Sequence, residues 1–293
     1  MKTLVSWGLD PLSLPACRQA GVPQEDEIFT SRWDGIEILM IKFPMTKILI
    51  LGIMIGVSLG WVTEEARSSG QQEYQLWADV LHDHVDDQGR VDYKKLQQNR
   101  AGLDAFLVQV GSANIDEMPA NGQKAFWINA YNALTLRTII DHYPVKSIRL
   151  INFGLVWKVP KNAARGKYSL GDIEHKILRP LGDPRVHFAL NCASIGCPKL
   201  PDTPFDPRRL DGQLDHETRR FMNDPQKVRL DRRENILYYS ELFDWYEDDF
   251  LVAAEDRLSY IKRYLNQKDR AYLETHEVAL KKIKYDWGLN KQQ

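Results

Sequence analysis

The sequence lacks several features that would point directly to a function. Only three cysteines occur in its 293 residues, the formal net charge is -1, and long Pro, Gly or Gln tracts are absent. Because the charges balance, we do not expect nucleic acid as a partner. No glycine-rich phosphate loop follows a predicted strand, so nothing indicates a nucleotide site. The absence of internal repeats and of low-complexity tracts argues against a repeat array.

The residues that are present fit one folded domain with extensions. Hydrophobic residues make up 43% of the chain, and eight Trp, twelve Tyr and ten Phe supply large side chains for a core. A chain of this length and composition can bury one substantial core.

One uncharged segment stands out at residues 48–62, which read ILILGIMIGVSLGWV. Lys42 and Lys47 precede it, and Glu64 and Glu65 follow it. A helix of this length spans only about 22 Å, less than the roughly 30 Å hydrocarbon core, which favours a signal peptide over a signal anchor. Lysine before and glutamate after the segment predict that the next domain lies outside the cytoplasm, either periplasmic or secreted, or anchored to the inner membrane.

This segment sets the expected organisation of the chain. We expect a tail at residues 1–44, a signal peptide or anchor at 45–66, a polar linker at 67–73 and the folded domain at 74–290. Signal peptides normally begin a chain, so we expect translation to start at Met40 or Met45, with the tail as a start-site artefact. A buried helix of a soluble protein is the other interpretation of the segment, but it shows no polar face at helical spacing.

The folded domain mixes helical and strand patterns. Apolar residues at helical spacing predict helices at residues 74–81, 103–110, 123–142, 170–179, 206–223 and 258–265, and an aromatic cluster at 242–250 also suits a helix. Alternation predicts strands at residues 185–191 and 283–287, and a hairpin from 228–230 and 236–239. No regular alternation of strand and helix appears. We therefore predict an α+β fold: a single globular domain with a central long helix, short strands and a hairpin.

Two asparagines interrupt the apolar face of the long predicted helix. Asn129 and Asn132 lie three residues apart, where a buried amide must find a hydrogen-bond partner. Either these amides bond a neighbouring loop or they face a ligand.

A second group of polar residues surrounds two of the cysteines. Ser169 and Asp172 have capping-box spacing and predict a short helix, on which His175 and Arg179 share a face. The predicted strand at 185–191 then places its histidine and asparagine together on one face, directly before the cysteines. Chemistry, if present, is expected here.

Five sequence blocks occur in one order and carry a resemblance. They read AFWINAYNALT at 125–135, LGDIEHKILRP at 170–180, HFALNCASIGCPKL at 187–200, WYEDDF at 245–250 and YDWGLN at 285–290. Together they resemble the domain of unknown function 547 family, which is found in bacteria, and the resemblance covers residues 74–290. It implies no settled activity. It does imply that His175, Asn191, Cys192 and Cys197 are motif positions.

A disulfide is the first of three interpretations of Cys192 and Cys197. The exported compartment expected above is oxidising, and Cys17 falls in the tail, which leaves an even pair in the domain. Closing so short a loop would stabilise the fold by about 2 kcal/mol.

A thiol nucleophile is the second interpretation. Cys192 follows a predicted strand, on which it would face away from His187, so His175 is the better candidate base. Asn191 or Glu174 could orient that base, and the backbone N–H groups that follow Cys192 could form an oxyanion site.

The third interpretation is a zinc site formed by Cys192, Cys197, His175 and His187, but the spacing does not match a structural zinc motif. We therefore expect no metal and no cofactor.

These patterns predict a thiol-dependent hydrolase or acyl transferase that acts on a peptide-like or amide substrate. Asn129, Asn132, His187 and Arg179 are the candidate substrate-binding residues. The alternative is a non-catalytic binding or structural module with a Cys192–Cys197 disulfide. We expect a peptide-like or small-molecule ligand, no nucleic acid, and membrane contact only through the N-terminal segment; the oligomeric state stays open. Trp245 and Tyr246 are expected in the core.

Overall fold

The computed structural model describes residues 74–293 of the chain. The tail, the signal or anchor segment and the linker expected at residues 1–73 therefore lie outside the described residues. Within the described part, no helix is long and apolar enough to cross a membrane.

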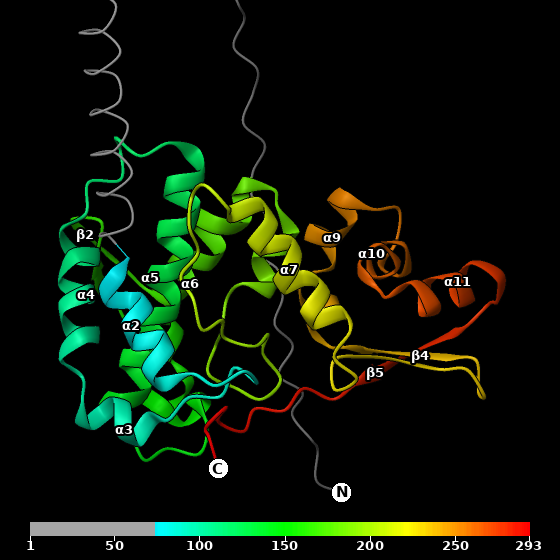
Figure 1. Ribbon diagram of the computed structural model, residues 1–293, viewed down its shortest axis with the longest axis horizontal. Helices are drawn as coiled ribbons and strands as arrows, with labels where there is room; N and C mark the ends of the chain where they lie inside the picture. Colours follow the sequence, from blue (N-terminus) through cyan, green and yellow to red (C-terminus); the bar gives the residue numbers. More distant parts are fainter. Residues whose placement is uncertain (1–73) are drawn as a thin grey trace, which may run out of the picture. The chain divides into compact units, whose positions relative to one another are not determined.

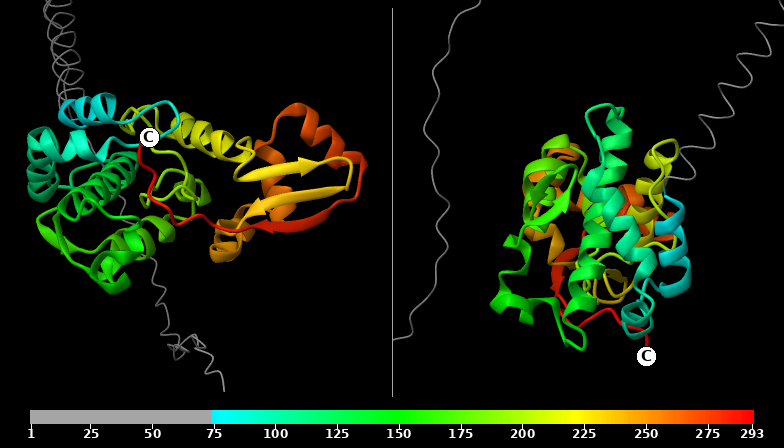
Figure 2. Two further views of the ribbon diagram at one scale, coloured as in Figure 1. Left: turned by 90° about the horizontal axis from the view of Figure 1, so that it is seen from below. Right: turned by 90° about the vertical axis from the view of Figure 1, so that its left-hand side faces the viewer.

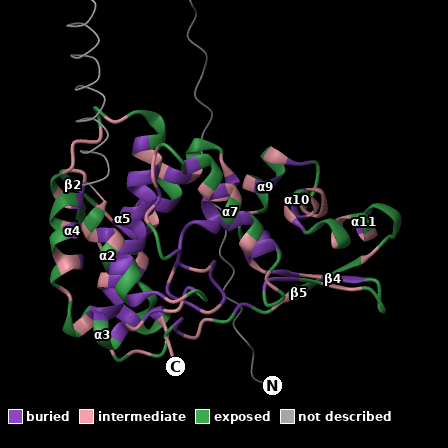
Figure 3. Ribbon diagram, in the orientation of Figure 1, coloured by how far each residue is buried: buried purple, intermediate pink, exposed green. Residues whose placement is uncertain are grey.

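A long central helix organises the first half of the fold. Helix α5 (Ala120–Asp141) is buried over most of its length, which confirms the predicted central helix, and Figure 3 shows this burial as a mostly purple ribbon. Helices α2 (Gln75–His84), α3 (Tyr93–Gln98) and α4 (Ala101–Ser112) lie beside it at one end of the molecule (Figure 1). Their apolar side chains form one large core cluster, in which Trp77 stacks on Phe106.

Short irregular helices follow α5 and carry several site residues. Residues 148–158 form the turns η1 (Ile148–Gly154) and η2 (Val156–Lys158). A small hairpin of β1 (Lys161–Ala163) and β2 (Gly166–Tyr168) then leads to α6 (Leu170–Asp172), the π-helical turn η3 (Ile173–Leu178) and η4 (Arg179–Leu181). The predicted capping box is present, because Ser169 and Asp172 each accept a hydrogen bond from the other's backbone N–H.

The strand predicted at residues 185–191 is wrong. Residues Pro184–Phe188 form the 3-10 helix η5 instead. Pro184 is preset for the first turn of a helix, and the Asp183 carboxylate accepts the Arg185 backbone N–H at 3.2 Å. His187 and Phe188, adjacent in sequence, are both buried, so the segment has no solvent face of the kind that alternation implied.

The second half of the fold holds a three-stranded sheet. After α7 (Leu210–Met222), strands β3 (Val228–Asp231) and β4 (Ile236–Ser240) form the predicted antiparallel hairpin. The aromatic segment forms α8 (Leu242–Trp245) and α9 (Glu247–Ala253), followed by α10 (Arg257–Tyr264) and α11 (Gln267–Thr275). The last strand, β5 (Ala279–Ile283), pairs parallel with β4 and ends before residue 285, earlier than predicted.

The two halves join into one globular domain of mixed helix and strand, in agreement with the predicted class. Helix α7 packs against η5, and a second core cluster gathers under the sheet around Phe188 and Phe243. The C-terminal segment leaves β5 and runs back to the helical end (Figure 2), where Lys291 bridges to Val91. This return path brings residues 285–290 to residues 192–197, the cysteine loop, where Ser194 bridges to Leu289.

Candidate functional site

A pocket of about 400 Å³ lies where the two halves of the domain meet the returning C-terminal segment. Its walls come from α5, η2, η3, η4, η5, the cysteine loop, α8 and residues 285–287. Aromatic and sulfur-containing side chains surround a few charged ones. The lining residues are Tyr131, Trp157, Glu174, His175, Arg179, His187, Leu190, Cys192, Cys197, Pro198, Leu242, Trp245, Tyr246, Tyr285 and Trp287.

The Glu174 carboxylate is buried in this pocket. Glu174 is only 7% exposed, and it accepts hydrogen bonds from the hydroxyls of Tyr131, at 3.1 Å, and Tyr246. Burial, followed by the negative charge of Glu174, raises the pKa of both tyrosines, which keeps them protonated as donors. Among residues 74–293, no Lys, Arg or His nitrogen lies within ion-pair distance of this carboxylate. Glu174 thus has hydrogen-bond donors but no counter-ion.

The other charges at the pocket neutralise one another. Asp249 accepts two hydrogen bonds from the Arg179 guanidinium, at 2.7 and 2.9 Å, and lies 2.6 Å from His187 Nε2. Burial alone would raise the pKa of Asp249, but the hydrogen bonds from His187 and Arg179 hold it well below its usual value. The His187 ring also stacks on Tyr246 at 3.8 Å. Asp249 therefore ties α9 to η4 and η5, and it positions the tyrosine that bonds Glu174.

His175, the predicted base, sits at the rim of the pocket. Its side chain is exposed, and its Nδ1 lies 3.3 Å from Arg179 Nη1. Within the described residues, no hydrogen bond joins His175 to the sulfur of Cys192 or Cys197. The structure therefore brings His175, Glu174 and Cys192 into one pocket without a hydrogen bond between the histidine and the thiol, and their catalytic roles stay predictions.

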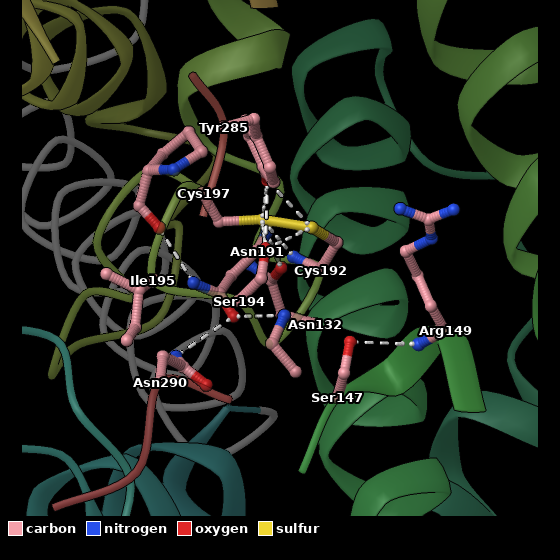
Figure 4. The surroundings of a disulfide bond; sticks show 12 residues. Asn132, Ser147, Arg149, Asn191, Cys192, Ser194, Ile195, Cys197, Tyr285 and Asn290 are labelled. Carbon is pink, nitrogen blue, oxygen red and sulfur yellow. Dashed lines mark hydrogen bonds between the residues drawn. A yellow bond between two sulfur atoms is a disulfide. The ribbon is translucent and has the colours of Figure 1, made fainter. Parts of the chain in front are cut away.

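The cysteine loop closes on itself. Cys192 and Cys197 lie at disulfide distance, with Cα atoms 6.1 Å apart. Figure 4 shows the Tyr285 hydroxyl beside both sulfur atoms, 3.2 Å from Cys192 Sγ and 3.0 Å from Cys197 Sγ, and Ser194 Oγ lies 2.9 Å from the same hydroxyl. Cys197 is buried, whereas Cys192 is partly exposed on the pocket side. In the described part of the chain, no three His, Cys, Asp or Glu side chains gather as a metal site.

The asparagines support the loops behind the pocket. Asn132 donates to Ala189 O at 3.0 Å and accepts the Asn191 backbone N–H at 2.9 Å. Asn191 in turn donates to Pro198 O at 2.7 Å and accepts the Ala193 N–H at 2.9 Å, which spans the cysteine loop. These contacts match the alternative in which the amides bond a neighbouring loop.

Asn129 holds a different loop in the same way. It pairs with both backbone groups of Phe205, at 2.9 and 3.0 Å, and its Oδ1 also accepts the Trp77 ring N–H at 3.3 Å. Asn129 and Asn132 do not line the pocket, so a direct role for them in binding a substrate stays a prediction.

A glycine lets the C-terminal segment approach the cysteine loop. A Cβ atom on Gly196 would lie 2.7 Å from the Tyr285 ring, closer than real contacts allow. The backbone N–H of Gly196 also donates to Asp286 O at 2.7 Å, and that of Ile195 donates to Gly288 O at 2.8 Å. Gly196 is thus needed for close contact rather than for an unusual turn.

Aromatic rings from three segments form the remaining wall. Trp287 lies 6.1 Å from Trp157 and 5.7 Å from Trp245, measured between ring centroids, and Tyr285 lies 4.7 Å from Trp245. Trp245 is 46% exposed, so its expected place in the core is wrong. Tyr246 is half-buried and lines the pocket.

Sequence reasoning did not select several residues that shape the site. Asp249, Tyr285 and Trp287 belong to the blocks at 245–250 and 285–290, but nothing in those blocks shows that Asp249 reaches η4 and η5 or that the two aromatic residues reach the pocket. Tyr131 belongs to the predicted helix at 123–142, where its position indicates only part of an apolar face. The available signal for its contact with Glu174 was a hydroxyl on that face together with an acidic residue in the block at 170–180.

Comparison with known families gives one match. A family model described as "Protein of unknown function, DUF547" matches residues 115–222. The matched segment includes α5, Glu174 and both cysteines, and it ends before Tyr246 and Tyr285. Comparisons with curated proteins and with solved structures returned no match.

Proposed function

We propose that this chain, which matches the DUF547 family model over residues 115–222, is a binding protein for a small peptide-like ligand that carries an ammonium group. The observation that carries the proposal is the Glu174 carboxylate, buried in an open pocket with no cationic group of the described residues at ion-pair distance; Arg179 acts on it only from farther away. A buried charge without a counter-ion costs several kcal/mol, and hydrogen bonds from two tyrosines offset only part of that cost. An ammonium group would complete the compensation.

The aromatic wall supports the same ligand chemistry. The faces of Trp and Tyr rings attract cations, with gains of about 0.5 to 2 kcal/mol each. Trp157, Trp245, Trp287 and Tyr285 line the pocket beside Glu174. Arg179 does not compete for the carboxylate at short range, because its guanidinium is held by Asp249 in two hydrogen bonds. The pocket therefore favours a positively charged group over a neutral or negative one.

The pocket also suits a peptide-like ligand in size and in its rim. A volume of about 400 Å³ lies within the range of small-molecule sites. His175 is exposed at the rim, and its Nε2 has no protein partner among the described residues, so it can hydrogen-bond an amide of the ligand. A lysine side chain with its flanking amides combines these features.

A matched pair of probes tests this proposal. Titrating the full chain with Nα-acetyl-lysine-N-methylamide should change the fluorescence of the tryptophans in the pocket, and the norleucine counterpart should bind about tenfold more weakly or worse. The norleucine compound keeps both amides and all four side-chain carbons but lacks the ammonium group. Equal binding of the two probes, or no binding of either, would contradict the proposal.

Two variants locate the effect. Glu174→Gln should remove the preference for lysine over norleucine, because it removes the charge but keeps the shape and an acceptor for the tyrosines. Glu277→Gln is the matched control, since Glu277 is exposed and has no side-chain contact in the structure. A Glu174→Gln variant that keeps the wild-type preference would refute the role of this carboxylate.

Thiol-dependent hydrolysis or acyl transfer on an amide substrate is the second candidate function. The observation that favours it is the placement of Cys192, the partly exposed cysteine, on the wall of the pocket that also holds Glu174 and His175. A dithiol reductant would first reduce the Cys192–Cys197 disulfide and leave both cysteines as thiols. The reductant itself would be oxidised to a disulfide. The Cys192 thiolate would then attack the amide carbonyl, His175 would protonate the leaving amine as the C–N bond breaks, and water or a second amine would cleave the thioester.

Thiol titration separates this candidate from the binding function. The catalytic candidate predicts that a dithiol exposes a reactive Cys192 and that Cys192→Ala and His175→Ala abolish turnover of an amide substrate in the reduced protein. The binding function predicts that lysine-probe affinity survives in Cys192→Ala. Full turnover in both variants would sink the thiol mechanism.

We also propose that the domain works outside the cytoplasm, in the periplasm or secreted, or anchored to the inner membrane through residues 45–66. The Cys192–Cys197 pair at disulfide distance supports this, because such bonds persist in oxidising compartments. Fractionation of cells that express the full chain, with the domain found in the cytosol, would contradict it.

A further inference from the structure

A second cavity, of about 350 Å³, also borders the cysteine loop and has a lining largely different from that of the aromatic pocket. Only Cys197 and Pro198 line both. The charged lining of the second cavity is strongly unbalanced. Four cationic side chains, those of Arg90, Lys199, Arg220 and Lys227, face it, whereas Asp224 is its one carboxylate among the described residues.

Lys227 is the most unusual of these cations. It is 5% exposed, and its ammonium donates to the backbone carbonyl of Ile195 in the cysteine loop. No described carboxylate lies within ion-pair distance of its Nζ. Burial, with the nearby charges of Lys199 and Arg90 acting in the same direction against Asp224 and Asp286, lowers the pKa of Lys227 to about 8. The lysine is therefore buried with a carbonyl as its hydrogen-bond partner and with no carboxylate at ion-pair distance among the described residues.

The other charges divide into engaged and free groups. Asp224 accepts the Gln226 backbone N–H at 2.9 Å and lies 3.5 Å from Lys199 Nζ, so it partly neutralises Lys199. Arg220 pairs with Glu217 at 3.3 Å and donates to Asp87 O at 2.7 Å. By contrast, the Arg90 side chain, which is half-buried, has no ion pair or hydrogen bond with a described residue. Arg90 and Lys227 are the two cations that face the cavity without a carboxylate partner.

The walls of this cavity are held in place. Gly89 has a φ of +70°, and a Cβ on it would lie 2.7 Å from the backbone nitrogen of Leu200, so the turn before Arg90 packs directly on the chain that leaves the cysteine loop. On the other side, the Asn290 amide donates to Gly89 O at 3.3 Å and lies 3.4 Å from Asn191 Oδ1. Segments distant in sequence therefore hold the turn that carries Arg90, and the hydrogen bond to Ile195 O holds Lys227 against the cysteine loop.

We propose that this cavity binds the phosphate or carboxylate group of a small anionic molecule, with Lys227 and Arg90 as its direct donors. A buried ammonium without a counter-ion is costly, and an oxyanion would provide the missing charge. Arginine offers a planar pair of donors that matches two oxygens of phosphate or carboxylate, and lysine adds a third donor. This site is separate from the Glu174 pocket, which takes the opposite charge.

Calorimetric titration of the full chain with inorganic phosphate, and in a second arm with acetate, tests the site at constant ionic strength and pH 7. We expect saturable binding of phosphate. Binding of acetate as well assigns the site to oxyanions in general, and its absence assigns the site to phosphate groups. Failure of both anions to bind would overturn the proposal.

Charge-removing variants decide whether the binding is local. Lys227→Gln and Arg90→Gln should each weaken phosphate binding about tenfold or more, whereas Lys281→Gln, which removes an exposed cation with no side-chain contact, should leave it unchanged. The Arg90 side chain is half-buried and makes no hydrogen bond or ion pair with a described residue, so its variant keeps the test decisive if Lys227→Gln lowers the yield of folded protein. Equal affinity in Arg90→Gln and Lys281→Gln would refute the site. Glu174→Gln should not change phosphate binding, which separates this result from the fate of the proposed function.

Discussion

Asp249 offers the sharpest test of how the pocket is held together. Its carboxylate receives three charge-assisted hydrogen bonds, from His187 Nε2 at 2.6 Å and from Arg179 at 2.7 and 2.9 Å. The side chains of Asp249, Arg179 and His187 are 21%, 28% and 1% exposed. Replacing Asp249 by Asn removes the charge and turns an amide donor toward groups that are themselves donors.

The structure sets the expected size of this effect. Breaking a fully buried ion pair costs about 3 to 5 kcal/mol, and an exposed pair contributes at most about 1 kcal/mol. Because Asp249 and Arg179 are partly exposed, we expect Asp249→Asn to lower the free energy of unfolding by about 2 to 3 kcal/mol. Asp248→Asn is the matched control in the same helical turn, since Asp248 is exposed and has no side-chain contact; it should change stability by less than about 1 kcal/mol.

The pH dependence of the free energy of unfolding tests the same interaction. The pKa of Asp249 is lower in the folded protein than in the unfolded chain, so its stabilisation is present above the unfolded pKa and is lost as the pH falls below it. With an unfolded pKa of about 3.9, the difference between wild type and Asp249→Asn should shrink by about 1 kcal/mol from pH 5 to pH 3. Urea unfolding followed by tryptophan fluorescence measures both differences. Equal effects of the two variants, or a difference that stays constant with pH, would refute the reasoning.

Three other predictions concern the cysteine loop and its supports. Asn132→Leu should lower the free energy of unfolding by about 2 to 4 kcal/mol, because it leaves one buried backbone N–H and one carbonyl without partners, as urea unfolding would show. Gly196→Ala should destabilise the fold by about 1 to 3 kcal/mol, since its methyl group would meet the Tyr285 ring. Gly212→Ala, in a helix with open space around it, should stabilise the fold by up to about 1 kcal/mol. Stability changes of the same sign in both variants would contradict the Gly196–Tyr285 contact. Reducing the Cys192–Cys197 bond should cost about 2 kcal/mol, and identical unfolding midpoints with and without a dithiol would show that the loop is not bonded in the purified protein.

The helical core and the hairpin were predictable because local patterns decide them. Helix α5 carries apolar residues on nearly every side and is followed by Pro144, and β3 and β4 flank a charged turn, so spacing alone locates these elements. The sheet's third strand was misplaced by four residues. Residues 283–287 alternate because Tyr285 and Trp287 line the pocket, and strand pairing ends at Ile283.

The strand predicted at residues 185–191 failed for a physical reason. Alternation indicates a strand only if one face meets solvent or a partner strand pairs with it. Here Phe188 enters an aromatic cluster with Phe221 and Phe250, His187 turns to Asp249, and the cap by Asp183 starts a helical turn. Two buried faces on a short capped turn give the same sequence pattern as a strand.

The sequence predicted the region of the candidate site but not the contacts that form it. The region around Cys192, Glu174 and His175 was selected, and all three residues do line one pocket. The contacts that define its charge join residues 43 to 72 positions apart, as in Tyr131 with Glu174 and Tyr246 with Glu174. Such pairings depend on the path of the chain, and no local spacing encodes them.

A crystal structure of the chain with Nα-acetyl-lysine-N-methylamide tests the central claim most directly, through the distance between the ligand's ammonium nitrogen and the Glu174 carboxylate. We predict a separation of about 3 Å, with the lysine chain against the tryptophan rings of the pocket. An ammonium group that points to solvent, or a ligand bound elsewhere with Glu174 still lacking a cationic partner, would contradict the account.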